Sequence, residues 1–175
     1  MNIQLAALAA SLFFSALGLA ATPSLKSGDT APLFTLKTQE GSDFALNSRK
    51  GRGWTVLYFY PKAETPGCTK QACAFRDSIK SIRVLNAEVY GISADSVDAV
   101  AAFHKNHHLN FDLLADPDSK VIEAYGVKMP LLKFAKRWTF LIDPELHIRE
   151  IETDVDPVKD ADHVAAELKR LQTER

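Results

Sequence analysis

The sequence carries little net charge and almost no cysteine. Its 21 basic and 22 acidic residues leave a formal net charge of −1, which gives no sign of a nucleic-acid or anionic-membrane partner. Only two of the 175 residues are cysteines, and 46% are apolar, so the chain can build a core without a disulfide. Internal repeats, low-complexity tracts and interdomain linkers are also missing. We therefore expect one domain that acts on a small neutral or polar substrate.

Charged side chains are absent from the first 25 residues. Residues 5–20 form a stretch rich in Ala, Leu and Phe that is short for a membrane span, and the small residues Ala20 and Ala21 end it. This pattern is typical of a signal peptide cleaved after Ala20 or Ala21, although residues 1–4 lack the usual Lys or Arg. We expect a leader over 1–21 and a periplasmic or otherwise exported domain over 22–175, without stable membrane association after cleavage. An uncleaved membrane anchor is the alternative.

The pattern of apolar residues predicts alternating strands and helices. Segments 31–36 and 43–46 flank a turn and predict a hairpin. Residues 54–60 have too little polar alternation for a half-exposed strand, which indicates a central, buried strand. A helix, strand, helix, strand, helix, two strands and a closing helix follow at 68–85, 87–93, 96–107, 111–115, 118–125, 137–143, 147–152 and 158–172. This order favours an α/β thioredoxin-like fold: a central mixed β-sheet flanked by helices, with an N-terminal β-hairpin.

The two cysteines, Cys68 and Cys73, lie five residues apart, directly after the predicted buried strand and a Pro-Gly turn. This order places Cys68 in the first turn of a helix, where unpaired N–H groups and the helix dipole favour a thiolate. In one regular helix the two Cα atoms would be roughly 8 to 9 Å apart, whereas a disulfide needs less than about 7 Å. The spacing therefore indicates a redox site that unwinds to form its disulfide. The alternatives are a permanent disulfide and a metal site, for which Cys-x2-Cys spacing is missing.

The residues around these cysteines resemble the catalytic signature of the peroxiredoxins, Pro-x-x-x-Thr/Ser-x-x-Cys, which runs here from Pro61 through Thr65 to Cys68. The flanking Tyr-Phe-Tyr-Pro-Lys and the Cys-Ala-Phe-Arg-Asp that begins at Cys73 are similar to the bacterioferritin comigratory protein, or peroxiredoxin Q, group. The distant arginine that completes the family's site matches Arg137. Together these matches are highly specific, although each alone would be weak.

The resemblance implies a thiol-dependent peroxidase that reduces hydrogen peroxide and organic hydroperoxides. Cys68 would become a sulfenic acid, which Cys73 would resolve as an intramolecular disulfide. An external, thioredoxin-like dithiol protein would then reduce that disulfide. We expect a monomer that uses no cofactor and no metal. The alternatives are an exported thiol-disulfide oxidoreductase, for which Cys-x-x-Cys would be the expected motif, and a binding module without catalytic activity.

The resemblance also assigns roles to the residues around the sulfur. Arg137 would stabilise the thiolate and the charge that develops on the peroxide oxygens. Thr65 would place its hydroxyl beside the sulfur and the peroxide, and Gly67 would let backbone N–H groups approach. Pro61 would shield the pocket from water.

Three further features have competing interpretations. His104 and His108 lie four residues apart, which suits metal ligands on a helix, but histidines near a helix end more often cap it. Glu64 could move protons, although a solvated charge is the simpler interpretation. The turn at 143–146 lacks the glycine that the family usually has there, which leaves the turn geometry open.

Overall fold

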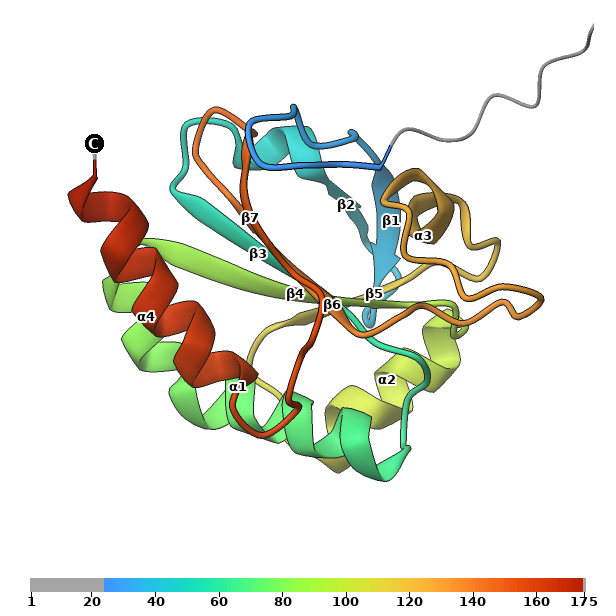
Figure 1. Cartoon of the computed structure of the whole chain (residues 1–175). Coiled ribbons are helices and arrows are strands. Elements are labelled where there is room, and N and C mark those ends of the chain that lie inside the picture. The colour runs from blue at the N-terminus through green and yellow to red at the C-terminus, as the bar shows by residue number, and fades with distance from the viewer. Residues whose placement is uncertain (1–23, 175) are drawn as a thin grey trace, which may run out of the picture.

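The computed structural model describes residues 24–174, so the predicted leader at 1–21 lies outside the described residues. Its strands are β1 Thr35–Thr38, β2 Asp43–Ala45, β3 Trp54–Phe59, β4 Ala87–Ser93, β5 Asp112–Ala115, β6 Trp138–Ile142 and β7 Ile148–Glu152. They form one sheet in the order β2-β1-β5-β4-β3-β6-β7 (Figure 1). The sheet is mixed, because β3, β4 and β5 run parallel while the outer pairs are antiparallel.

Strand β3 is an inner strand of the sheet and lies between β4 and β6. All six of its residues are buried, which confirms the prediction from its apolar run, since a strand covered on both faces has no polar alternation. The predicted hairpin is also confirmed, with β1 and β2 paired antiparallel.

Helices cover both faces of the sheet (Figure 1). They are η1 Leu46–Arg49, α1 Pro66–Val84, α2 Val97–Asn106, α3 Lys120–Ala124 and α4 Asp160–Thr173. Side chains from α1, α2 and α4 share one core cluster with one face of the sheet, and side chains from α3 and η1 share a second cluster with the other face. The α/β thioredoxin-like prediction is therefore confirmed. Among the described residues no helix combines the length and the apolar character that a membrane span requires.

Helix boundaries follow local signals. Helix α1 begins at Pro66, two residues before the predicted start, because proline suits the first helical position, where its missing N–H costs nothing. Ser96 caps α2, since its side chain accepts a hydrogen bond from the backbone N–H of Ala99. Helix α4 begins at Asp160, later than predicted.

The turn between β6 and β7 forms without glycine. Leu146 adopts the left-handed conformation, with φ 67°, and its side chain is buried. The Asp143 carboxylate accepts from the backbone N–H groups of Glu145 and His147 at 2.9 and 3.0 Å. These bonds and the burial of Leu146 offset the roughly 1–2 kcal/mol that this conformation costs a residue other than glycine.

Candidate active site

Cys68 lies in the first turn of α1, as the sequence predicts, and its residue surface is 1% exposed. Thr65 occupies the N-cap position, but its side chain makes no hydrogen bond to the start of the helix. The N–H groups of the first turn therefore keep their capacity to donate. The thiol shares a core cluster with Tyr58 and Tyr60, whose rings stack at 5.5 Å. Burial raises the pKa of Tyr58 well above its ordinary value, and the neighbouring Tyr60 and Cys68 add to that rise.

The Arg137 guanidinium contacts the thiol, with Nη2 3.5 Å from Cys68 Sγ. Sheet register explains the contact: β6 pairs with β3 so that Trp138 opposes Phe59, which places the preceding arginine beside the loop that leads into α1. Gly67 provides the room, because a Cβ there would lie 3.1 Å from Arg137 Nη2. The structure thus brings together the distant arginine and the cysteine that the signature selects.

Two buried side chains that sequence reasoning missed support this arginine. Arg137 Nη1 donates to Gln71 Oε1 at 2.6 Å, and Gln71 Nε2 donates to Asp160 Oδ2 at 2.6 Å. Thr139 also donates to Asp160 Oδ2, at 2.8 Å. Burial raises the pKa of Asp160, while the bonds from Gln71 and Thr139 oppose that rise. Gln71 could have been found from its place three residues after Cys68 on the same helix face; no sequence signal points to Asp160.

Thr65 and Pro61 lie in the loop between β3 and α1, as expected. The Thr65 hydroxyl donates to the Lys62 carbonyl at 2.9 Å, and in the described part of the chain no hydrogen bond joins it to Cys68. Its oxygen lone pairs remain able to accept from a bound peroxide. The backbone N–H of Ala63 donates to Asp95 at 2.8 Å, which anchors the loop. The shielding role of Pro61 stays a prediction.

Glu64 is exposed, as its interpretation as a solvated charge expects, and it is also paired. Its carboxylate lies 2.8 Å from His107 Nε2 and accepts from Asn106 at 2.9 Å. These hydrogen bonds, that of His107 first, lower the pKa of Glu64. Helix α2 ends at Asn106 and His108 has a left-handed φ of 50°, so His104 and His108 do not share a helical face. The loop that carries Thr65 is thus tied to the end of α2.

Cys73 is a free, partly buried thiol in the second turn of α1. Arg76 lies beside it; hydrogen bonds to Asp77, and to a lesser extent the interaction with Cys73, raise the pKa of Arg76. Arg76 and Asp77 form an ion pair at 2.8 Å. Because both cysteines belong to one helix, a bond between them requires part of α1 to unwind.

Comparisons with known proteins agree with this arrangement. The family model described as "AhpC/TSA family" matches residues 27–151. A chloroplastic peroxiredoxin Q of Sedum lineare is 43% identical over 148 residues, which cover 83% of this chain and 77% of that protein. The structure of peroxidoxin BcpB from Mycobacterium tuberculosis is 36% identical, with a TM-score of 0.79 over 84% of this chain and 98% of that one. The bacterioferritin comigratory protein of Xanthomonas campestris, studied for alkyl peroxide reduction, is 30% identical, with a TM-score of 0.74 over 79% and 91% of the two chains.

Proposed function

The chain belongs to the AhpC/TSA family and, within it, to the bacterioferritin comigratory protein and peroxiredoxin Q group of peroxiredoxins, which are thiol peroxidases, and from this membership we propose an atypical two-cysteine cycle run by Cys68 and Cys73. The observation that carries the proposal is the contact of Arg137 Nη2 with Cys68 Sγ at the first turn of α1. It places a fixed planar cation beside the nucleophile.

In the first step the Cys68 thiolate attacks one peroxide oxygen. The S–O bond forms as the O–O bond breaks, and the electron pair leaves on the second oxygen, which takes a proton and departs as water or an alcohol. Arg137 stabilises the charge that develops on the oxygens, and the first-turn N–H groups of α1 add to this effect. Cys68 is left as a sulfenic acid. We propose organic hydroperoxides as well as hydrogen peroxide as substrates, supported by the alkyl peroxide reduction studied in the Xanthomonas relative.

In the second step the Cys73 thiolate attacks the sulfenic sulfur. The S–S bond forms and hydroxide leaves, which takes a proton and becomes water. Both cysteines start in α1, so this step includes unwinding of the turn between them. A thioredoxin-like dithiol protein then supplies two electrons and returns both thiols.

We further propose that residues 1–21 are a cleaved signal peptide and that a monomer acts outside the cytoplasm. The uncharged leader and its small terminal residues support export. Resolution within one chain supports a monomer, because it needs no second subunit. The mass of the natural protein should place its first residue at Ala21 or Thr22, and sedimentation should give the mass of one chain. An intact Met1 in a cytoplasmic fraction would refute export.

An alternative function, that of an exported thiol-disulfide oxidoreductase, has less support. No observation in the described residues favours it, and the arginine held against the first cysteine suits peroxide chemistry. Insulin reduction with dithiothreitol tests it directly, and we expect no activity above background.

The two cysteine variants test the cycle. Cys68→Ser should not turn over peroxide, since a serine alkoxide does not form near neutral pH. Cys73→Ser should reduce one equivalent of peroxide and then stop as a sulfenic acid, unless a small thiol resolves it. Peroxide consumption with and without dithiothreitol separates the two outcomes. Steady-state turnover by Cys68→Ser would remove the assignment of the nucleophile.

A further inference from the structure

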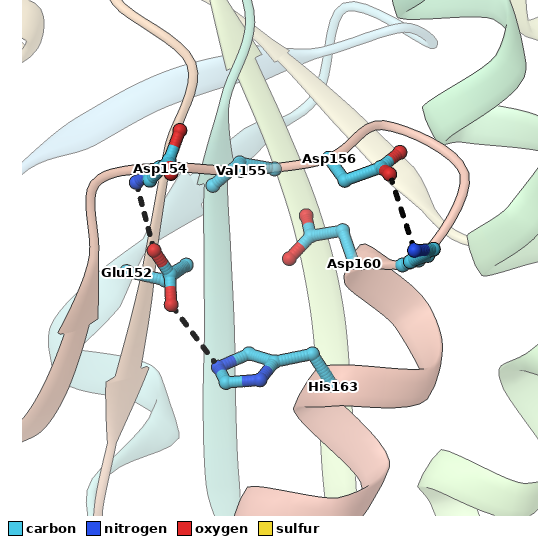
Figure 2. A pocket seen from close by; sticks show the side chains of 7 residues that line it. Glu152, Asp154, Val155, Asp156, Asp160 and His163 are labelled. Atoms are coloured by element: carbon cyan, nitrogen blue, oxygen red, sulfur yellow. Dashed lines mark hydrogen bonds and ion pairs between the residues drawn. The ribbon is translucent and has the colours of Figure 1, made fainter.

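A cavity of about 150 Å³ lies where β7 leads into α4. Its wall is rich in acidic side chains, among them Glu152, Asp156 and Asp160, and His163 closes one side (Figure 2). The chemistry of the peroxidase cycle uses neither Glu152 nor His163. The cavity therefore needs an explanation of its own.

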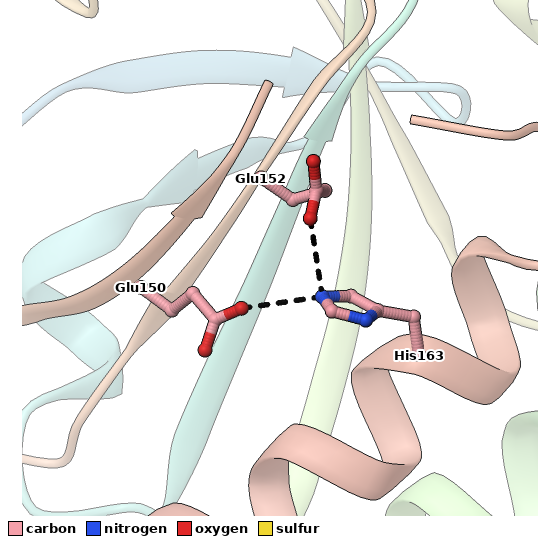
Figure 3. A group of neighbouring side chains, drawn as sticks. All are labelled: Glu150, Glu152 and His163. Atoms are coloured by element: carbon pink, nitrogen blue, oxygen red, sulfur yellow. Dashed lines mark hydrogen bonds and ion pairs between the residues drawn. The ribbon is translucent and has the colours of Figure 1, made fainter. Parts of the chain in front are cut away.

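Glu150, Glu152 and His163 bring three possible metal ligands together (Figure 3). His163 Nε2 lies 3.2 Å from Glu150 Oε1 and 3.4 Å from Glu152 Oε2, and the three ligand atoms all lie within 4.8 Å of one another. The two glutamates are two residues apart on β7, so they share one face of the strand, and α4 presents the imidazole to them. Arg170 Nη2 donates to the other oxygen of Glu150, Oε2, at 3.3 Å.

Asp160 supplies a second, independent observation. Its residue surface is 3% exposed, and its Oδ1 atom has no hydrogen-bond partner in the part of the chain that the structure describes. Figure 2 shows its carboxylate directed into the cavity, between Glu152 and Asp156. The other oxygen, Oδ2, already accepts from Gln71 and Thr139. A buried carboxylate oxygen normally has a partner, which a bound cation or its water would supply here.

We propose that Glu150, Glu152 and His163 bind a divalent first-row transition-metal ion, and that a water on this ion donates to Asp160 Oδ1. One imidazole with two carboxylates suits Mn²⁺ or Zn²⁺ better than Mg²⁺ or Ca²⁺, which prefer sites made of oxygen alone. Three protein ligands leave positions for water on the ion.

Mn²⁺ is the probe for this site, because it is a hard ion that thiolates bind weakly. The reduced protein is titrated with Mn²⁺, and proton NMR follows the imidazole signals of the five histidines. Bound Mn²⁺ broadens signals of nearby protons, so the His163 signals should broaden first and the other four should stay sharp. Loss of the free-ion signal in electron paramagnetic resonance should give one bound ion per chain. Neither measurement requires peroxidase activity, so the proposed enzyme cycle and this site can fail separately.

Matched variants complete the test. Glu152→Gln keeps the shape of the side chain and should weaken Mn²⁺ binding about tenfold or more. His147→Gln is the control and should leave binding unchanged. This exposed imidazole lies 3.8 Å from the Asp143 carboxylate, and among the described residues the two belong to no group of three possible metal ligands. His163→Gln provides a second ligand variant, with folding checked by circular dichroism.

Three results would overturn the proposal. Simultaneous broadening of all histidine signals would show that the exposed side chains bind the ion without selectivity. Unchanged affinity in both Glu152→Gln and His163→Gln would show that the cluster is not the site. Loss of binding in Cys73→Ser, with Glu152→Gln unaffected, would place the ion on sulfur.

Discussion

Replacing Gln71 with methionine should slow peroxide reduction, because this amide holds Arg137 against Cys68. Gln71 is fully buried. Its side chain accepts a hydrogen bond from Arg137 at 2.6 Å and donates one to Asp160 at 2.6 Å. Methionine has a similar length and cannot make either bond. Each bond involves a charged group and contributes about 1.5–3 kcal/mol. Apolar burial of methionine offsets part of this loss, so the free energy of unfolding should fall by about 3 kcal/mol.

The effect on rate comes from position and not from charge. In Gln71→Met the guanidinium keeps its charge but loses the acceptor that fixes Nη1, so Nη2 is no longer held 3.5 Å from the sulfur. We expect peroxide attack to slow by about ten- to a hundredfold, which corresponds to roughly 1.4–2.8 kcal/mol in the barrier. Single-turnover stopped-flow fluorescence of the reduced protein measures this step, and urea unfolding measures stability.

Two further variants separate positioning from stability. Thr139→Val removes the hydrogen bond of 2.8 Å that the Thr139 hydroxyl donates to Asp160. It leaves the hydrogen bond between Arg137 and Gln71 in place. It should lower stability by about 1.5–3 kcal/mol and leave the rate within about twofold. Gln71→Glu keeps an acceptor for Arg137 but places a second carboxylate against Asp160, so it should lose stability while keeping most of its rate. If Thr139→Val slows the reaction as much as Gln71→Met, or if Gln71→Met reacts at the wild-type rate, the positioning argument fails.

Three other predictions concern the same region. Arg137→Ala should slow peroxide attack by about 10²-fold or more, by analogy with loss of an oxyanion donor, and Arg137→Lys should recover only part of the rate because it lacks the planar fork; a near wild-type rate for Arg137→Ala in stopped flow would contradict this. Oxidation to the Cys68–Cys73 disulfide should increase amide hydrogen exchange at 69–73, measured by mass spectrometry, and equal protection in both forms would rule out unwinding. The lowered pKa of Glu64 means that its ionised form stabilises the fold above its unfolded pKa of about 4.3, and that this contribution is lost as pH falls through the folded pKa. In urea unfolding at pH 3–6, Glu64→Gln should therefore lose less stability on acidification than the wild type; parallel curves would show that the pair with His107 contributes nothing.

The sequence alone determined the features that depend on residues close together in the chain. The apolar run of β3, the serine cap of α2 and the place of Cys68 in the first turn of α1 all follow from local patterns. The starts of α1 and α4 each lie two residues from the predicted position. In α1 the cause is Pro66, because proline suits the first helical position. The catalytic signature could also be identified, since its proline, threonine and first cysteine span only eight residues.

Only the tertiary structure decided which distant side chains meet. Arg137 reaches Cys68 across 69 residues because of the register between β6 and β3. Gln71 meets Asp160 across 89 residues because α1 packs beside α4. The pairing of Glu64 with His107 and the grouping of Glu150, Glu152 and His163 likewise join separate elements. Local patterns encode which face of an element is buried but not which partner covers it, so the buried polar contacts that hold the site became visible only after the sheet and helices had been assembled.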